Sequence, residues 1–556
     1  MTENVRYDGS LKASVILKDL APFVPALSRF EEPLDLNLVF SGHGKHLDCP
    51  TLQLANHHGL MIAGEAALSN WDAGMDMYIY GKLGNLIMTK EGINVLMTNL
   101  TGKVPPILQR LDYIRFNGEA AGYLHDLTLT GLFYTGAGMV KTDVMMSIDE
   151  QSMSRTYSGS VASADLDLGK LLNQEKKFGK VDFNVELKGF NYKNRYPESY
   201  IKGIISSFEY SQYQYENIML DGVYKDGGFN GRLSMDDANG SVQIDGNFNV
   251  AKTIPDFNLK ASVKNLRPHD LHLSDKYENA SISLGLTADF TGKSIDDMNG
   301  RISLDSLQLN APDERGCFLD NLTITAGQVS GEKELRINSS FMTAVIRGDY
   351  SYHTIPASVV KTVQRYIPSL LTIKDNMPDP HNNFQFDICL ENTEVLSKLF
   401  QIPLELYLPA SLKGYFNDGE EKLHVEGHFP EFKYNGTRYD SGVLFCENPS
   451  DRFKCSLRGG MLMKSGAMLN FSVEANAKND HLETTINWGN NTDVTYGGKF
   501  AADTRFFKTE GPHPILQADI NIQPTKVVLN DTVWNIHPSH LSLIHISEPT
   551  RPEPIS

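Results

Sequence analysis

Histidine and carboxylate side chains at alternating positions are the residues of this sequence best spaced for metal chemistry. His424, Glu426 and His428 stand at positions i, i+2 and i+4 of the segment LHVEGHF. A β-strand would present all three on one face, where imidazole and carboxylate groups could bind zinc. Such groups on an exposed strand face are usually only solvated, so we predict no metal site. The same interpretation applies to a looser histidine cluster, His43, His46, His57 and His58.

Acidic pairs could in principle bind calcium or serve as an acid and a base. They are Asp165/Asp167, Asp236/Asp237 and Asp296/Asp297. Turn and strand-edge positions explain them better, because aspartate hydrogen-bonds local backbone there. The sequence contains no G-x-S-x-G, H-E-x-x-H, P-loop or dinucleotide-binding motif. We therefore predict a protein that is not an enzyme, with no catalytic residues and no cofactor.

Five scattered cysteines show no C-x-x-C and no metal-ligand spacing; they are Cys49, Cys317, Cys389, Cys446 and Cys455. Cys446 and Cys455 could face each other across a hairpin, but we favour small buried or reduced residues at all five positions.

Length and charge limit the possible classes of protein. The 556 residues exceed what one hydrophobic core normally supports, so several domains or a repeat array are expected. The net charge of −17 disfavours a nucleic-acid partner. No signal peptide is visible at the N-terminus, and apolar runs are broken by charge before the ~20 residues of a spanning helix.

The C-terminal segment from Leu541 reads LSLIHISEPTR, which matches the translation of a transposase-library sequencing adapter. We expect residues 541–556 to be a read-through artefact whose removal leaves folding unchanged, and the natural chain to be truncated at both ends.

Period-two alternation dominates the remainder. Leu34, Leu36, Leu38 and Phe40 alternate with polar residues, as expected for half-buried strands. The pattern recurs at 127–134, 181–190, 241–250, 280–290, 302–309 and 481–488. Predicted turn pairs separate the strands at Asp226-Gly227, Asn239-Gly240, Asn299-Gly300, Asp418-Gly419 and Asn435-Gly436. The predicted fold is mainly β: an elongated, twisted, largely antiparallel sheet forming a trough with an apolar interior and few short helices.

Two helices are predicted, over 104–114 and 357–371, each packed over an end of the sheet. A degenerate repeat of strand, short leucine-rich turn or helix, and strand recurs at 13–42, 160–189, 261–292 and 387–414. The predicted segments are a β-groove over 1–355, a helix over 356–375, a continuing groove over 376–540, and the tail.

Several segments in this order resemble TamB domain-containing proteins of Bacteroidota, within the AsmA-like lipid-bridge family. They are ASADLDLGKLL, the block from Phe208 to Asn249, KNLRPHDLHL and NIQPTKVVLNDTVWNIHPSHL. The resemblance implies a periplasmic protein, anchored to the inner membrane in its full-length form by a helix this sequence lacks. It also implies phospholipid transfer between membranes, or outer-membrane protein assembly with a barrel of the TamA or BamA kind.

The first functional hypothesis is thus a non-enzymatic lipid conduit, because a continuous apolar groove would shield acyl chains from water. The candidate groove residues are Leu34, Leu36, Leu38, Phe40, Leu127, Leu129, Val181, Phe183, Val185, Leu284 and Leu286. Ordinary sheet core in a sealed sandwich explains the same pattern. The alternative hypothesis is a β-helical or β-sandwich polysaccharide-active envelope protein, with Tyr210, Tyr213 and Tyr215 as an aromatic platform.

Overall fold

Antiparallel strands make up most of the protein in a computed structural model. Strands account for 66% and helices for 9%, and the sheet is not closed into a barrel, which confirms the predicted fold class. The structure describes residues 5–20, 28–149, 151–152, 154–191, 198–276, 278–312, 316–371, 381–490, 496–509, 515–529, 531–536 and 539–545. None of the helices in these ranges is long and apolar enough to cross a membrane.

The chain divides into two units, Met1–Ser283 and Leu284–Ser556. The elements of the first unit are β1 (Arg6–Ile16), η1 (Leu17–Leu20), β2 (Pro33–His43), β3 (His46–Ala55), β4 (Leu60–Ser69), η3 (Gly74–Asp76), β5 (Tyr78–Thr89), α1 (Lys90–Thr101), α2 (Pro106–Gln109), β6 (Tyr113–Tyr123), β7 (Asp126–Thr135), β8 (Gly138–Ile148), β9 (Arg155–Ala164), β10 (Leu166–Asp167), α3 (Leu168–Leu172), β11 (Phe178–Asn191), β12 (Glu198–Tyr210), β13 (Tyr213–Lys225), β14 (Gly228–Asp237), β15 (Gly240–Asn249) and β16 (Asp256–Leu266).

The next strand, β17 (Ser281–Thr291), contains the boundary between the units. The later elements are η4 (Ile295–Asp297), β18 (Asn299–Asn310), β19 (Cys317–Leu319), β20 (Leu322–Val329), β21 (Glu332–Ser339), β22 (Met342–Asp349), α4 (Ile355–Gln364), β23 (Asn383–Leu390), α5 (Glu394–Phe400), β24 (Leu404–Leu406), β25 (Ala410–Asn417), β26 (Lys422–Tyr434), β27 (Thr437–Glu447), β28 (Phe453–Leu462), β29 (Met468–Lys478), β30 (His481–Asn490), β31 (Gly497–Lys508), β32 (Leu516–Ile522), β33 (Thr525–Leu529), β34 (Thr532–Ile536) and β35 (Ser539–His545).

Neighbouring strands pair as the turn signals predict. β13 and β14, for example, join at Asp226-Gly227, and β26 and β27 join at Asn435-Gly436. The prediction for Asn299-Gly300 is wrong, because these residues begin β18 and η4 lies in the preceding connection. Gly300 is needed there for close backbone approach: a Cβ would lie 2.2 Å from the carbonyl oxygen of Asp289.

The helices differ from the sequence prediction in position and length. The 104–114 helix is reduced to α2, since Tyr113 already begins β6, and the 357–371 helix is α4, which ends at Gln364. No helix was predicted over Lys90–Thr101, where α1 lies. The Thr89 side chain caps α1 by accepting from the Gly92 N–H at 3.2 Å, and Gly102 ends it in the left-handed conformation.

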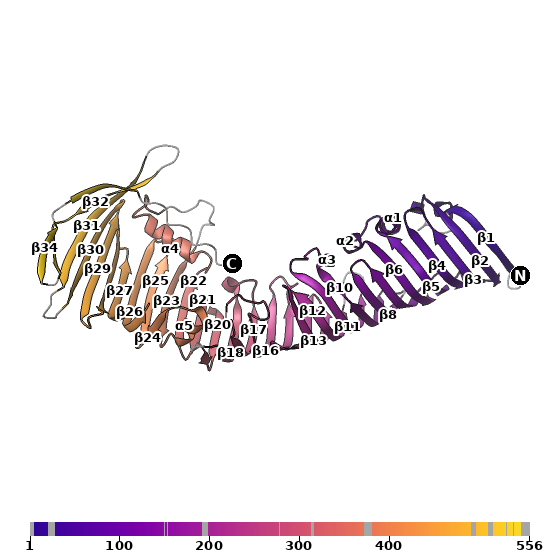
Figure 1. Cartoon of the computed structure of the whole chain (residues 1–556), viewed down its shortest axis with the longest axis horizontal. Helices are drawn as coiled ribbons and strands as arrows, with labels where there is room; N and C mark the ends of the chain where they lie inside the picture. The colour runs from indigo at the N-terminus through magenta and orange to yellow at the C-terminus, as the bar shows by residue number, and fades with distance from the viewer. Residues whose placement is uncertain are drawn as a thin grey trace. The chain divides into compact units, whose positions relative to one another are not determined.

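Helical segments pack against the ends of the strands and bury small apolar clusters. Figure 1 shows α1, α2 and α3 along one margin of the strands of the first unit. Ile93 of α1 is 1% exposed and packs with Leu111, Ile114 and Ala137. In the second unit, α4 packs over Phe384, Phe416 and Leu423. The fully buried apolar side chains therefore gather mainly beneath helical segments and turns.

Two of the predicted segments extend beyond the described residues. Residues 541–545, assigned from the sequence to the adapter tail, pair with β32 as part of β35, whereas residues 546–556 lie outside the described residues. Residues 372–375 of the predicted helical segment also lie outside them.

Candidate functional site: the apolar face of the sheet

One face of the sheet in the first unit carries uncharged, largely apolar side chains from strand to strand. Directly opposed residues of antiparallel strands point to the same face, so the pairing register traces rows across the sheet. The central row is Leu11, Leu38, Leu52, Gly64, Leu83, Gly118, Gly131, Thr142, Val161, Val185, Gly203, Leu220, Leu233, Ile244 and Ala261. We call this side of each unit's sheet the apolar face.

The second unit has an equivalent row. It comprises Ile302, Ile324, Ile337, Ala344, Ile388, Leu412, Gly427, Leu444, Leu457, Val473, Ile486 and Phe500. No charged residue occurs in either row. Five same-face positions on a ten-residue strand span about 27 Å, so the apolar face is wide enough for acyl chains to lie across it.

All the predicted groove residues of the first unit lie on this face. Leu38 and Val185 belong to the central row, and the others stand an even number of residues from it on β2, β7 and β11. In the second unit, Leu284 and Leu286 share a side of β17 with Phe290. The Cα of Phe290 lies 2.5 Å from where a Cβ on Gly300 would stand, so Phe290 is opposite Gly300 on β18. Ile302 is two residues from Gly300 and shares its face. Leu284 and Leu286 therefore lie on the same face as Ile302.

Most of these side chains are neither sealed nor fully exposed. Leu34 and Val181 are buried at 5% exposure, whereas the other nine candidates are half-buried. In a single sheet layer, each side chain is half-buried because its neighbours on the same face cover part of its surface. The candidates therefore remain partly accessible, which a sealed sandwich core would not allow.

Aromatic rings lie over glycines in the apolar face. The Phe116 ring lies 2.5 Å from where a Cβ on Gly131 would stand, and the Phe229 ring is equally close to Gly222. Trp488 covers Gly498 in the same way in the second unit, at 2.4 Å. Glycine at these positions lets the rings lie against the backbone, which keeps the surface apolar where a side chain is missing.

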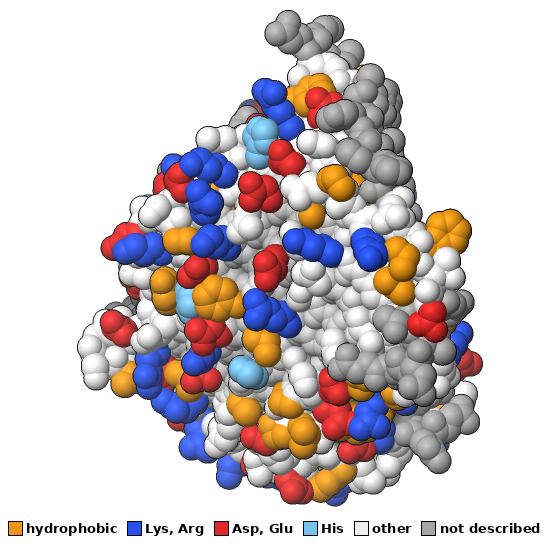
Figure 2. All heavy atoms as spheres, turned by 90° about the vertical axis from the view of Figure 1, so that its left-hand side faces the viewer, with side chains coloured by type: hydrophobic (Ala, Val, Ile, Leu, Met, Phe, Trp, Pro, Cys, Tyr) orange, Lys and Arg blue, Asp and Glu red, His pale blue; other side chains and the backbone are white. Residues whose placement is uncertain are grey.

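The opposite face of the first unit carries charged cross-strand pairs. Lys202 Nζ lies 3.4 Å from Asp221 Oδ2, and Arg232 Nε lies 2.5 Å from Asp245 Oδ1. We call this side the polar face. Figure 2 faces the left-hand side of Figure 1, where strands of the second unit lie, and shows acidic and basic side chains interspersed there, with hydrophobic ones in small groups between them.

Four clefts of the first unit, of about 460 to 670 Å³, open on the polar face. Glu65 and Lys82 line one of them, and Lys202, Asp221 and Arg232 line another. Glu65 pairs with Lys82, and Lys202 pairs with Asp221, so each of these two clefts presents charges of both signs.

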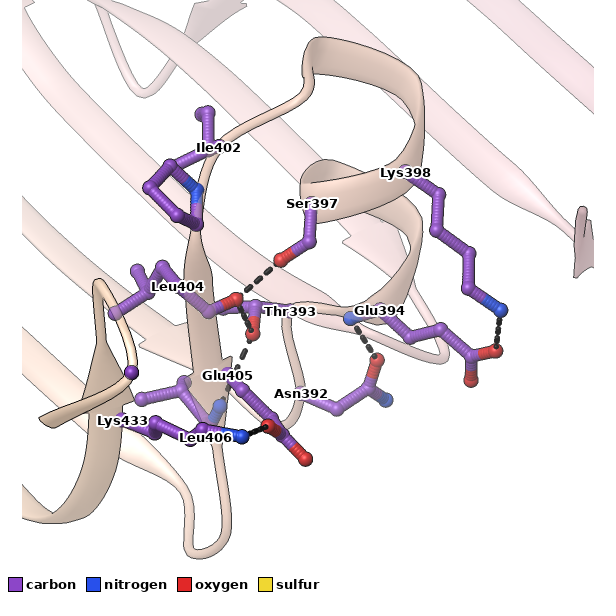
Figure 3. A pocket seen from close by; sticks show the side chains of 12 residues that line it. Asn392, Thr393, Glu394, Ser397, Lys398, Ile402, Leu404, Glu405, Leu406 and Lys433 are labelled. Carbon is purple, nitrogen blue, oxygen red and sulfur yellow. Dashed lines mark hydrogen bonds and ion pairs between the residues drawn. The ribbon is translucent and has the colours of Figure 1, made fainter. Parts of the chain in front are cut away.

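A fifth cleft, of about 720 Å³, lies beside α5 (Figure 3). Its walls are held by local contacts: Thr393 Oγ1 donates to the Leu404 carbonyl at 2.8 Å, and Lys398 pairs with Glu394 at 2.7 Å. Lys433 pairs with Glu405 at 3.4 Å. The Thr393 contact holds the start of α5 against β24, whereas the two ion pairs lie within α5 and between β24 and β26.

The structure brings His43 and His46 together, with ring centroids 5.3 Å apart, but His58 lies apart from them. His46 contacts Asp48 and Ser69 at one end of β3, whereas His58 contacts Glu32 and Glu91 at the other. On β26, His424 Nε2 lies 3.0 Å from Glu426 Oε1 and the ring stacks on Tyr415. No group of three potential ligands in the described ranges is arranged to hold a metal ion.

The acidic pairs and cysteines have structural roles. Asp167 caps α3 by accepting from the Lys170 N–H at 2.8 Å, and Asp296 accepts from the Tyr352 N–H at 2.6 Å. Hydrogen bonds from Ser294 and nearby backbone lower the pKa of Asp297 to about 2. Cys446 and Cys455 are opposed on β27 and β28 and joined as a disulfide, so the interpretation favouring unpaired cysteines is wrong for this pair.

The tyrosines considered as a carbohydrate platform pack beneath the segment that follows β16. Tyr215 is 8% exposed and donates to the Leu271 carbonyl at 2.8 Å. Tyr213 donates to Asp237 Oδ1 at 2.5 Å, and burial together with this bond raises the pKa of Tyr213 to about 12. These hydroxyls are engaged within the protein and hold a turn over the end of the sheet.

The contacts of His58 give a prediction about pH. Its ring joins Glu91 in the first turn of α1 to Glu32 before β2, and the hydrogen bond with Glu91 raises the pKa of His58. A raised pKa means that the stabilisation is present below about pH 6.5 and is lost as pH rises through the folded-state value.

We therefore expect amide hydrogen exchange in α1, corrected for intrinsic rates, to be faster at pH 8 than at pH 6. His58→Gln should remove this difference. Equal protection of α1 at both pH values in the unmodified chain would contradict the prediction.

Comparison of the chain with protein-family models, with curated proteins and with solved structures finds no match.

Proposed function

We propose that this chain is a non-enzymatic lipid-binding segment whose apolar face carries acyl chains. The observation that supports the proposal is the uncharged central row, which continues through every strand from β1 to β9 and β11 to β16. Each acyl CH₂ kept out of water is worth about 0.8 kcal/mol, so two long chains gain on the order of 20 kcal/mol from such a surface.

The polar face supports the same proposal. Its cross-strand ion pairs, such as Lys202 with Asp221, keep that side hydrated while the other side takes up lipid. A sheet with one hydrated face and one apolar face suits lipid movement across an aqueous space. The chain would work in the bacterial periplasm, moving phospholipid between membranes or assisting outer-membrane protein assembly with a barrel partner, as the resemblance implies.

Site-specific photo-crosslinking tests the proposal. A benzophenone amino acid is placed at Phe183 or Leu36 on the apolar face, and at the adjacent polar-face positions Asn184 or Asn37 as matched controls. With vesicles of phosphatidylethanolamine and phosphatidylglycerol, we expect phospholipid adducts at Phe183 and Leu36 only. Folded protein with no adduct at either position, or with equal adducts at all four, would refute the proposal.

A further inference from the structure

A single charged side chain interrupts the apolar face on four neighbouring strands of the second unit. On β20 to β23, every residue that shares this face is uncharged except Lys333, near the start of β21. Lys333 stands four residues before Ile337 of the central row, so the two side chains point to the same side. The nearby cations Arg336 and Arg347 lie on the opposite face, where both pair with Glu334.

The ammonium of Lys333 is held at the end of the strand without a counter-charge. Its Nζ donates to the Tyr350 carbonyl at 2.8 Å and lies 3.9 Å from the centroid of the Tyr350 ring. The side chain is half-buried, and burial lowers the pKa of Lys333. An ammonium can donate three hydrogen bonds, whereas Lys333 makes one, and no ion pair, within the described residues.

The carboxylate of Asp296 does not neutralise Lys333 by direct contact. Its charge acts on Lys333, but its own oxygens accept from Ser351 Oγ at 2.9 Å and from the Tyr352 N–H at 2.6 Å. Asp296 is therefore bound to the segment before α4. The remaining N–H donors of Lys333 are left for a group that comes from outside the protein.

A second donor stands beside the ammonium. Gln328 of β20 is directly opposite Lys333 on the same face, and its side chain is exposed. Side chains opposed in this way have Cβ atoms about 4.5–5.5 Å apart. The amide nitrogen of Gln328 offers two N–H donors, so one anionic group could accept from both residues.

We propose that Lys333 and Gln328 bind the phosphate of a phospholipid whose acyl chains lie on the apolar face of the second unit. This inference rests on the proposed lipid-binding function and names the headgroup site for it. A phosphate oxygen accepts strong, charge-assisted hydrogen bonds from an ammonium. The net charge of −17 gives the chain no general attraction for anions, so an anionic lipid depends on a local cation such as Lys333.

The length of β21 suits the acyl chains of such a lipid. From Lys333 past Ile337 to the end of the strand at Ser339 is about 20 Å. The acyl chains of one bilayer leaflet span about 15 Å, half of the hydrocarbon core. A phospholipid with its phosphate at Lys333 can therefore lay its chains across the central row.

Photo-crosslinking of two lipids that differ only in the headgroup tests the inference. The full chain carries a benzophenone amino acid at Ile337, in dodecyl maltoside micelles with phosphatidylglycerol or with diacylglycerol of the same acyl chains. We expect the adduct with phosphatidylglycerol to exceed that with diacylglycerol roughly tenfold. Inorganic phosphate in large excess should not remove this preference, because the acyl chains supply most of the affinity.

Three substitutions in the crosslinking chain separate the charge of Lys333 from its packing. Lys333→Met keeps an unbranched side chain against Tyr350 and should bring the ratio of the two adducts close to one. Lys333→Arg keeps the charge and should keep the preference. Lys499→Met is the matched control, because Lys499 is exposed on the opposite face of β31, and it should also keep the preference.

The outcomes distinguish this inference from the proposed function. Equal adducts of the two lipids in the crosslinking chain would overturn the headgroup site and leave lipid binding intact, and this comparison needs no substitution of Lys333. A preference that survives in folded Lys333→Met would also overturn it. A preference removed by inorganic phosphate would show a site for free anions instead. Folded protein with no adduct from either lipid would overturn the lipid-binding function and the headgroup site together.

Discussion

Replacing Phe183 or Leu284 by aspartate should slow lipid transfer strongly while leaving the protein folded. Both side chains are half-buried on the apolar face, so a carboxylate there keeps access to water. The expected cost in stability is the lost burial, about 1.5–3 kcal/mol. A sealed core would add several kcal/mol for an unpaired buried charge.

The effect on transfer comes from the acyl chain that must pass the new charge. If about two CH₂ groups lose their apolar contact there, the barrier rises by about 1.6 kcal/mol, which slows transfer roughly fifteenfold. The measurement is transfer of fluorescent phospholipid between two vesicle populations, alongside chemical denaturation. Asn184→Asp, on the opposite face of the same strand, is the matched control and should transfer normally. Global unfolding of both apolar-face variants would favour a closed β-core and count against the conduit.

The strands and their faces could be predicted from the sequence because period-two alternation is local information. Leu34, Leu36, Leu38 and Phe40 share a face in any strand that includes them. The register that joins Leu38 to Leu52 and onward to Ala261 could not be read in this way, because it depends on turn lengths and on bulges such as the one between Cys49 and Leu52.

The helices were harder to predict because they are short and packing decides them. The capping signals of α1, Thr89 before it and Gly102 after it, are present in the sequence, but Thr and Gly are also common between strands. The helix predicted through Ile114 was cut short by β6, where Phe116 packs against Phe133 of β7 across the sheet. Tertiary pairing outweighed local helix preference there.

Asn382 is a residue whose importance the sequence did not signal, because its partners are remote. Its side chain is fully buried, and its Nδ2 donates to Ser358 Oγ at 2.7 Å and to Thr354 Oγ1 at 3.0 Å. Its Oδ1 accepts from the Ser351 N–H at 2.9 Å. These bonds fix the start of α4 to the strand that follows it, and hold the helix over the apolar cluster of Phe384 and Phe416.

Asn382→Leu should therefore destabilise the second unit by about 3–5 kcal/mol. Leucine has the branching of asparagine but can neither accept from the Ser351 N–H nor donate to Ser358 Oγ and Thr354 Oγ1, and each lost bond at this buried position costs about 1–3 kcal/mol. Denaturant unfolding measures the loss, and binding of a hydrophobic dye reports whether α4 has left the cluster. Asn383→Leu is the matched control, because Asn383 is exposed on β23 and should change stability by less than about 0.5 kcal/mol. Equal stabilities of the two variants would show that α4 is held by apolar packing alone, and that the buried hydrogen bonds of Asn382 contribute nothing to its position.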